Sequence, residues 1–456
     1  MENRAKADPP EVSQVDAERV FGSLHTAWNQ YVEQGDDPKY WWVGNALGAA
    51  LTFAEHWSAV GGAPSVLEPL AGMVSYGFRQ VFPKGFNSGS NWFDDHGWWA
   101  LALIQAYEQG LQGNGDSKDD YLRAAWNVWH LLRTKAWDEE GAPGLPAGGC
   151  WNKNPDLGGA VKNTVVNGLY LTLSARLARF GEELSSVVPG SSYQDCADAA
   201  QASYRWWSEW IQPASSVQYP PLANNMANQP QWLVRDTATP LDGDNAYLQC
   251  VITQEQGLLI AGLAELVAMG QSLQPGEIGD PDATLSPEDL LKSVAGAVLA
   301  PFFPGESQIV QEPPFSFQFG VSPLGDYRKD ESTGRGGLLR FLSQHRDVVG
   351  RGFDKPFEST AGAASQANQK GSTLDPDWVV CEDRQAAVRL WATIWGVDPG
   401  ATTPPFLLSC GSSAGSTCGQ CLFGGFLSGD EGAFLCRTNE VDAMSAFLSN
   451  TSRDFR

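Results

Sequence analysis

Apolar residues recur at helical spacing along most of this chain, and that period limits the possible folds more than any other feature of the sequence. In the segment VDAERVFGSLHTAWNQYVEQ, residues 15–34, the apolar stripe includes Val20, Leu24, Ala27 and Trp28. Segments of the same kind follow one another, and no stretch of strict alternation between apolar and polar residues predicts a β-sheet. We therefore expect an all-α protein.

The sequence predicts about twelve helices of ordinary globular length, joined alternately by short and long connections. This alternation suggests helical hairpins, and six hairpins can close into a ring with inner helices around a central pocket and long loops at one mouth. Such an (α/α)6 barrel is the expected fold. An irregular bundle and a helical solenoid are the alternatives, although no repeat of fixed length is present. The expected helices lie at 15–34, 40–60, 64–81, 97–110, 119–137, 160–183, 192–211, 254–273, 286–303, 334–345, 381–396 and 439–450.

No linker rich in Pro or Gly separates two differently patterned regions, so we expect one domain over residues 1–456. Length alone is compatible with two or three domains, but some barrels reach this size as a single unit. A Cys/Gly/Ser-rich segment at about 401–436 precedes the last expected helix.

The chain carries 30 basic and 53 acidic side chains, a formal net charge of −23. This charge opposes binding to nucleic acid and to anionic lipid, because both are themselves negatively charged. No apolar run reaches the roughly 18 residues that a membrane-spanning helix needs. The balance is typical of a soluble protein that acts on a neutral substrate, and we expect a monomer.

Eight cysteines are present, and four of them lie close together at Cys410, Cys418, Cys421 and Cys436. An even number permits a set of disulfides, which we expect to pin this loop and which implies an oxidising compartment. The single C-x-x-C is weak support for zinc without a second pair or a nearby His, so we expect no metal and no cofactor. A secreted or cell-surface location follows, although residues 1–20 contain no apolar core of a signal peptide.

Two adjacent acids, Asp94 and Asp95, stand among aromatic residues in NWFDDHGWWALALIQAYEQG, residues 91–110. One interpretation is helix capping, since an Asp at a helix start accepts hydrogen bonds from free N–H groups and faces the positive end of the helix dipole. A cap needs only one acid, however, and the flanking rings lower the local dielectric, which raises carboxyl pKa values. Two close carboxyls then tend to separate into one ionised and one protonated group, the division of roles that glycoside hydrolysis requires.

The spacing of the two acids is compatible with this second interpretation. Neighbouring residues of a helical turn place their Cβ atoms roughly 5–6 Å apart. A retaining glycosidase holds its two carboxyl groups about 5–5.5 Å apart, although side-chain rotamers could open the gap to the wider spacing of an inverting enzyme.

The segment WFDDHGWWALALIQAYE resembles the catalytic segment of glycoside hydrolase family 76, the α-1,6-mannanases, in which an Asp-Asp pair precedes a Trp-Trp-Ala-Leu helix. Three further segments are similar to that family in the same order: GGCWNKNPDLGGAVKNTVVNGLYLTLSARLAR, VITQEQGLLIAGLAEL and STGRGGLLRFLSQ. In the last two, Gln254 and Glu255 replace the usual Tyr-Asn, and Arg335 stands where Lys is usual. The similarity covers most of the chain, from about Val20 to Ala443.

The resemblance implies an (α/α)6 barrel and a retaining, endo-acting α-1,6-mannanase whose partner is an α-mannan polysaccharide or oligosaccharide. It assigns Asp94 as the nucleophile and Asp95 as the general acid/base, and it includes transglycosylation as a related activity. Aromatic and amide side chains nearby are candidate sugar ligands, since rings cover the C–H faces of sugars and amides bind hydroxyl groups. These candidates, with one arginine, are Trp92, Phe93, Trp98, Trp151, Asn163, Asn167, Gln256 and Arg335.

Two other classes of function remain open. One is another (α/α)6 glycosidase, or a polysaccharide lyase, although a lyase acting on uronates would need a basic path that the net charge disfavours. The other is a non-catalytic carbohydrate-binding protein of the cell wall that kept the barrel and lost turnover.

Overall fold

The computed structural model describes residues 12–35, 38–83, 92–113, 115–141, 147–211, 232–234, 236, 252–272, 286–303, 308, 310, 334–369 and 429–451. Helices dominate this part of the chain, and the β contacts within it are isolated bridges. The main helices are α1 (Gln14–Trp28), α2 (Tyr40–Ala59), α3 (Glu68–Tyr76), α5 (Phe93–Glu108), α6 (Lys118–Leu131), α7 (Thr164–Ala178), α8 (Glu182–Val187), α9 (Tyr193–Ile211), α10 (Thr253–Ser272), α11 (Pro287–Phe302), α13 (Gly334–Gln344), α14 (Arg346–Val349), α15 (Asp354–Gln369) and α18 (Gly429–Thr451).

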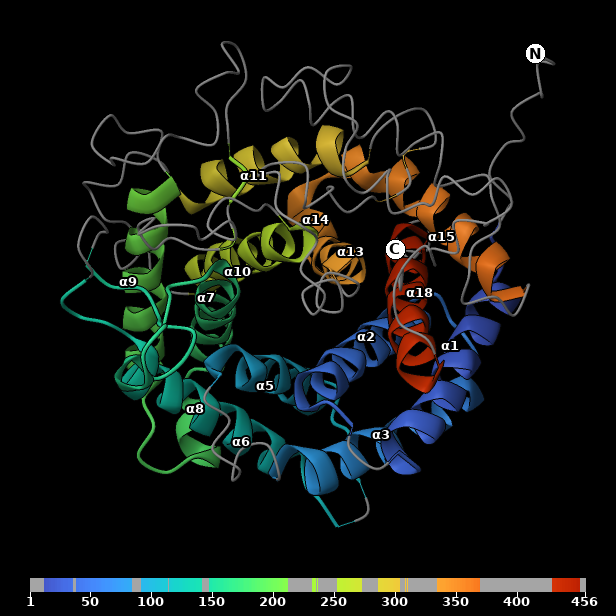
Figure 1. Ribbon diagram of the computed structural model, residues 1–456, viewed down its shortest axis with the longest axis horizontal. Helices are drawn as coiled ribbons and strands as arrows, with labels where there is room; N and C mark the ends of the chain where they lie inside the picture. The colour runs from blue at the N-terminus through green and yellow to red at the C-terminus, as the bar shows by residue number, and fades with distance from the viewer. Residues whose placement is uncertain are drawn as a thin grey trace.

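Six of these helices form a closed inner ring, in which each helix packs against the next (Figure 1). The order around the ring is α2, α5, α7, α10, α13 and α18, and α18 returns to α2. The intervening helices pack on the outside, with α1 and α15 against α18, α6 against α5, α9 against α7 and α11 against α10. This arrangement confirms the expected (α/α)6 barrel of paired helices.

The inner helices run parallel, so their N-terminal ends gather at one end of the barrel. There, the Trp99 indole N–H of α5 donates to the Tyr40 carbonyl at the start of α2 (2.8 Å). At the opposite end, Arg176 near the end of α7 pairs with Glu108, the last residue of α5 (2.7 Å). The connections that lead into the inner helices, such as residues 137–163, are longer than those that leave them, such as residues 109–117. The long connections therefore enter at the N-terminal end of the ring.

Glycines near the start of five inner helices let the next helix approach closely. A Cβ built on Gly97 of α5 would lie 2.8 Å from Leu169 of α7, and one on Gly168 of α7 would lie 2.8 Å from Cβ of Leu258 on α10. Real Cβ atoms essentially never come so close to another atom, so a larger residue at these positions would push neighbouring helices apart. Comparably tight contacts occur at Gly44, Gly257 and Gly336.

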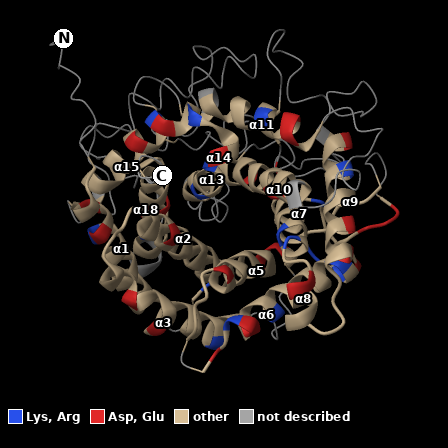
Figure 2. Cartoon of the chain, turned by 180° about the vertical axis from the view of Figure 1, so that it is seen from behind, with Lys and Arg blue, Asp and Glu red and all other residues tan. Residues whose placement is uncertain are grey.

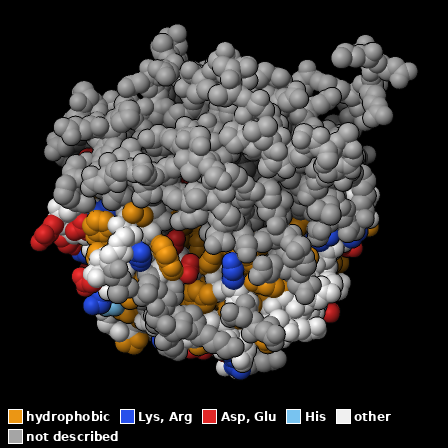
Figure 3. Space-filling view, viewed as in Figure 1, with side chains coloured by type: hydrophobic (Ala, Val, Ile, Leu, Met, Phe, Trp, Pro, Cys, Tyr) orange, Lys and Arg blue, Asp and Glu red, His pale blue; other side chains and the backbone are white. Residues whose placement is uncertain are grey.

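The core of the barrel is rich in tryptophan, which explains much of the unusual total of 18 residues. Charged side chains, in contrast, lie mainly on the outer helices (Figure 2). On the described part of the face seen in Figure 3, hydrophobic side chains appear with a few acidic and basic ones among them. Among the residues that the structure describes, the completely buried tryptophans are Trp28, Trp42, Trp57, Trp99, Trp206 and Trp207.

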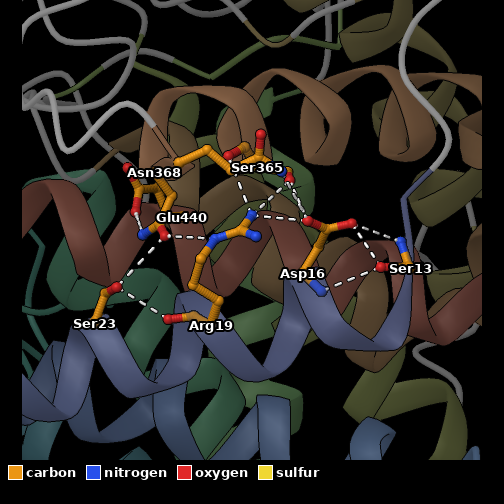
Figure 4. Close-up of polar contacts among 8 residues, drawn as sticks. Ser13, Asp16, Arg19, Ser23, Ser365, Asn368 and Glu440 are labelled. Atoms are coloured by element: carbon orange, nitrogen blue, oxygen red, sulfur yellow. Dashed lines mark hydrogen bonds and ion pairs between the residues drawn. The ribbon is translucent and has the colours of Figure 1, made fainter.

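A polar network joins the first and last of the described helices, α1 and α18, through the outer helix α15 (Figure 4). Arg19 of α1 donates to the Ser365 hydroxyl (2.9 Å) and to Asn368 Oδ1 (3.2 Å), both on α15. Asn368 donates in turn to Glu440 of α18 (2.8 Å), while Asp16 of α1 accepts from both Arg19 and Ser365. Buried polar contacts therefore hold together helices that lie almost at opposite ends of the sequence.

The largest differences from the sequence expectation concern two long helices, while the short helices α8 and α14 were also not expected and α5 begins four residues earlier than expected. The apolar stripe of α15 is too weak to predict it, because much of its buried surface is polar and includes Ser359, Thr360 and Ser365. The last helix begins at Gly429 instead of near residue 439, so Cys436 lies on α18 and its assignment to the Cys/Gly/Ser-rich loop was wrong. The helix expected at 381–396 lies outside the described residues, as does that segment up to residue 428.

Candidate active site

Asp94 and Asp95 lie in the first turn of α5, at the N-terminal end of the inner ring, and both are half-buried. The N-cap residue of this helix is Trp92, and no side chain caps the helix. Neither acid is therefore the N-cap residue, although both occupy the first turn, where the capping interpretation also placed them. Both carboxyl groups nevertheless lie in the positive field of the helix N-terminus, which favours their ionised forms.

A second Asp-Asp pair, on an outer helix, shows what a capping acid looks like in this protein. Asp119 and Asp120 open α6, where Asp120 forms a capping box with Ser117 and an ion pair with Arg123 (2.8 Å). The backbone hydrogen bond from Ser117 is the main reason why the pKa of Asp120 lies below its usual value. On α6 one acid of the dipeptide belongs to a capping box, whereas on α5 the N-cap residue is Trp92, whose side chain makes no such bond.

Tyr40 and His96 lie beside the acid pair, and the sequence analysis did not identify Tyr40. The Tyr40 hydroxyl is 3.0 Å from His96 Nδ1, and His96 is buried. Burial, with a smaller contribution from the negative charge of Asp95, raises the pKa of Tyr40 above its usual value. The phenol therefore stays protonated close to Asp95. Its only signal in the sequence is an aromatic residue at a helix start.

The loop of residues 148–153 reaches the start of α5. The Asn152 carbonyl accepts the Phe93 N–H (2.7 Å), and Trp92 and Lys153 form an antiparallel β-bridge. The Lys153 ammonium lies 5.1 Å from the centre of the Trp92 ring, and Trp92 is 44% exposed. An open aromatic surface therefore stands two residues before Asp94.

The predicted amide ligands make backbone contacts at the N-terminal ends of α7 and α10. Asn163 is the N-cap of α7 and accepts the Val166 N–H (3.0 Å). Asn167 is completely buried, accepts the Cys150 N–H (2.7 Å) and donates to the Cys150 carbonyl (3.0 Å). Gln256 makes the same pair of bonds with the backbone of Val234, each at 2.8 Å. As sugar ligands these residues remain predictions, and their contacts here fix the loops that precede the two helices.

The remaining candidates differ in how far they are accessible. Phe93 and Trp98 are buried, and the Trp98 ring stacks with Phe341 of α13 at 6.2 Å between ring centres. Trp151 is half-buried. Arg335 belongs to the first turn of α13, but its side chain is not among the described atoms. The candidates thus come from the starts of α5, α7, α10 and α13 and from the loops before them, and all belong to one end of the barrel.

A second pair of acids lies at this end. Asp236 and Glu255 are joined by a hydrogen bond between their carboxyl groups, and burial raises the pKa of Asp236 to about 6. The Asp236 carbonyl accepts the Thr164 N–H at the start of α7 (2.7 Å), and Glu255 accepts the Ile252 N–H (3.3 Å). Glu255 is one of the three residues, with Gln254 and Arg335, in which the sequence departs from the pattern of the resembled family.

The cysteines of the described residues do not form disulfides, which corrects the expectation for them. Cys150 and Cys196 are buried free thiols, and the Cys436 thiol donates to Glu440 Oε1 (3.6 Å). Burial raises the pKa of Cys150 and of Cys196 above the usual value, so both are unreactive thiols. The C-x-x-C of Cys418 and Cys421 lies outside the described residues.

The sequence profile of glycosyl hydrolase family 76 matches residues 16–275, more than half of the chain and the part that carries the acid pair. The chain belongs to glycosyl hydrolase family 76. The resemblance that the Asp-Asp segment suggested is therefore confirmed. Within the described residues, no helix is both long and apolar enough to cross a membrane.

Relatives within family 76 are distant. The chain is 26% identical over 249 residues to mannan endo-1,6-alpha-mannosidase DCW1 of Saccharomyces cerevisiae, which covers 52% of this chain and 48% of the relative. The corresponding protein of Candida glabrata is 25% identical over 241 residues, 51% of this chain and 46% of the relative. The chain therefore spans about half the length of the curated relatives it matches.

Solved structures share the fold. The α-1,6-mannanase GH76A from Salegentibacter sp. superposes with a TM-score of 0.51 at 16% identity, over 94% of this chain and 99% of that one. Dfg5 from Chaetomium thermophilum, in complex with glucosamine, superposes with a TM-score of 0.57 at 17% identity, over 98% and 93% of the two chains. At this level of identity the likeness shows the (α/α)6 fold alone.

Proposed function

We propose that this family 76 protein is a retaining, endo-acting glycoside hydrolase that cleaves α-1,6-linked mannan. The observation that carries the proposal is the position of Asp94 and Asp95, which lie side by side and half-buried in the first turn of an inner helix whose N-cap residue is Trp92. The names of the yeast relatives support the substrate. So does the Salegentibacter mannanase, of which an inactive variant with two aspartates replaced by asparagine is in complex with α-1,6-mannotriose.

In the proposed mechanism, Asp94 is the nucleophile and Asp95 the general acid/base. The ionised Asp94 attacks the anomeric carbon of an α-mannosyl unit while Asp95 gives its proton to the leaving oxygen, so that a covalent glycosyl-enzyme forms. Asp95 then takes a proton from water, which attacks the same carbon and releases Asp94. A sugar hydroxyl in place of water gives transglycosylation by the same steps.

Neighbouring groups support the proposed chemistry, but the field of the helix N-terminus acts on both acids and does not distinguish their roles. The N-terminal field of α5 stabilises the negative charge that Asp94 needs for attack. Tyr40 keeps its proton because burial and the nearby Asp95 charge raise its pKa, so its hydroxyl does not compete as an acid near neutral pH. The exposed ring of Trp92 offers a platform for one sugar of the chain.

We also propose that the protein acts outside the cell or at its surface, because its proposed substrate is a polysaccharide. The described cysteines do not support this location, since Cys150 and Cys196 are free thiols. The location is therefore inferred from the substrate.

The decisive experiment is incubation with α-1,6-mannan, followed by measurement of new reducing ends and by ¹H NMR of the first anomer released. Wild-type protein should release α-configured internal fragments. Asp94→Asn and Asp95→Asn should each lower kcat by about 10²–10⁴-fold, with unchanged far-UV circular dichroism. Asp119→Asn is the matched control, because it alters the Asp-Asp pair of an outer helix, and it should retain full activity.

The outcome also separates the alternatives. Binding of mannan oligosaccharides without any product would favour a non-catalytic carbohydrate-binding protein. Products from another glycan, with none from α-1,6-mannan, would favour a different (α/α)6 glycosidase. Normal turnover in either acid variant would contradict the mechanism.

A further inference from the structure

We infer that Lys162 is a positioning residue for the proposed reaction. From a buried position it holds residues 148–153 in the arrangement that fixes the start of α5, and with it Asp94 and Asp95. The inference rests on the proposed function, but one of its tests below does not depend on activity.

Lys162 is a completely buried lysine with three kinds of contact. Its ammonium pairs with Asp138 Oδ2 (2.8 Å), donates to the Gly148 carbonyl and lies 5.0 Å from the centre of the Trp151 ring. Its side chain has no exposed surface, so it cannot reach a substrate. A buried charge of this kind is costly and often adds little net stability compared with apolar residues. A role in selecting one loop arrangement explains why it occupies this site.

The segment that Lys162 contacts is fixed at several other points. The Trp151 N–H donates to the Ala136 carbonyl (2.9 Å), and the Asp138 N–H donates to the Gly149 carbonyl (3.0 Å). From the other side, Asn167 holds both backbone groups of Cys150. The loop is therefore held between residues 136–138 on one side and the start of α7 on the other.

The backbone of this loop packs closely against aromatic rings at two glycines. Gly148 has φ +94° and Gly149 φ +82°, values that favour glycine. A Cβ on Gly148 would lie 2.9 Å from the Trp137 ring, and one on Gly149 would lie 2.6 Å from the Trp206 ring. The loop is packed against two aromatic rings, so a change at the Lys162 end is transmitted along it instead of being absorbed.

The same loop ends at the acid helix. Asn152 accepts the N–H of Phe93, the residue directly before Asp94, at 2.7 Å. Asn152 is itself held by Val161, through a backbone bond of 2.8 Å and a bond from the Val161 N–H to its side chain of 2.9 Å. Lys162 is the next residue after Val161. A continuous set of contacts therefore runs from Lys162 to the first turn of α5.

These contacts link two segments of the sequence, GGCW at residues 148–151 and KNTVVN at residues 162–167. Lys162 and Asn167 hold the loop, and the loop places both Trp151 and the backbone that precedes the acid pair. Displacement of reacting groups by even about 1 Å can lower a rate by about 100-fold. We therefore expect loss of Lys162 to lower kcat more than it changes KM.

The test compares three variants. Lys162→Met removes the charge and leaves the half-buried Asp138 without this partner, so it should lower both the melting temperature and kcat. Lys162→Met/Asp138→Asn removes both charges, and should regain most of the melting temperature while kcat stays at least about tenfold below wild type. Lys292→Met is the control, since Lys292 makes an exposed ion pair with Glu288 on α11 and should behave as wild type.

A second measurement works without turnover. Hydrogen–deuterium exchange of the peptide containing residues 92–98 reports on the Phe93 N–H and the first turn of α5. Exchange there should be faster in the double variant than in wild type, and unchanged in Lys292→Met. This result supports the positioning role even if the natural substrate differs from α-1,6-mannan.

The inference fails if the double variant regains both the melting temperature and the wild-type kcat, because Lys162 would then be only a structural ion-pair partner. Unchanged exchange in residues 92–98 would overturn it as well. An inactive wild-type protein would instead contradict the proposed function, and would leave the exchange experiment to decide the role of Lys162.

Discussion

The two ends of the inner ring carry opposite charge arrangements. At the N-terminal end, Asp94 and Asp95 lie in the first turn of α5 and Glu255 in the first turn of α10. At the C-terminal end lies a cluster with two arginines, which we call the basal ion cluster: Glu108, Arg176, Arg179, Glu265 and His345. The acids in the first turns and the two arginines agree with the helix dipoles, which favour acids at N-termini and cations at C-termini. Glu108, the last residue of α5, is instead compensated by its ion pair with Arg176.

The ends differ in how their acids are compensated. Glu265 is contacted by Arg176 (3.3 Å) and also pairs with Arg179. Although burial alone would raise the pKa of Glu265, the nearby cations hold it below its usual value. Asp236, at the other end, shares a hydrogen bond with a second acid, and burial raises its pKa to about 6. At the C-terminal end, ion pairs thus join neighbouring helices. At the N-terminal end, burial raises the pKa of a carboxyl group, and such shifts are common at functional sites.

The largest effect on stability is expected from Glu265→Gln. The change leaves Arg176 and Arg179 without their shared partner, and breaking a buried ion pair from one side typically costs about 3–5 kcal/mol. Urea unfolding should show this loss, while kcat per folded molecule stays at the wild-type value. Glu288→Gln, in an exposed pair with Lys292, is the control and should change stability by less than about 1 kcal/mol. A large loss of kcat in folded Glu265→Gln would contradict the separation of the two ends.

The next effect concerns pH at the basal end. Burial lowers the pKa of His345 from its usual value of 6.5 to about 4, despite the nearby Glu265. The unfolded chain takes up this proton near pH 6.5 and the folded protein only near pH 4, so the histidine removes stability as pH falls through that range. The loss should reach about 2–3 kcal/mol at pH 4.

Unfolding in urea between pH 4 and 8 checks this contribution. His345→Gln should flatten the acid side of the stability profile, whereas His130→Gln, on the exposed side of α6, should leave it unchanged. An identical acid slope in wild type and His345→Gln would show that the histidine does not titrate as the buried cluster requires.

The smallest effect, of opposite sign, is expected at the N-terminal end. Asp236 loses its proton near pH 3.8 in the unfolded chain but near pH 6 in the folded protein. Its contribution is therefore complete at low pH and is lost as pH rises from about 4 to 6, by about 2 kcal/mol. In the same urea series, Asp236→Asn should gain stability relative to wild type as the pH rises through this range.

The exposed Asp156→Asn is the control for Asp236, and it should follow the wild-type profile. If Asp236→Asn and wild type lose stability in parallel across this range, the two ends of the ring do not respond to pH in opposite directions.

The sequence predicts what depends on local pattern. Helical periodicity was sufficient to predict the paired helices, and the Asp-Asp segment was sufficient to identify the family. The boundaries of α18 and the existence of α15 were missed, because the buried face of α15 relies on side chains such as Ser365 and Asn368, whose partners are distant in the sequence. A periodicity of apolar residues cannot reveal a helix held by polar contacts.

The candidate site was predicted in part for the same reason. The position of Asp94 and Asp95 at the mouth of the barrel follows from the start of one helix. The roles of Lys162 and Asn167 do not, because they depend on a loop that folds back from a different part of the chain. A polar residue in the first turns of a helix looks alike in sequence whether its side chain faces a ligand or a carbonyl group. Only the structure shows that Asn167 binds the backbone of Cys150.

Closure of the ring through α18 has a consequence for biosynthesis. The helices that α18 covers, α1 and α2, are complete by residue 59, whereas α18 begins only at residue 429. At a translation rate of about 5–20 residues per second, α18 is synthesised on the order of 20–80 s after α1 and α2, so it cannot cover their apolar faces before then. During that interval the nascent chain exposes surface that can aggregate, so we expect it to depend on chaperones until the ribosome has delivered its last helix.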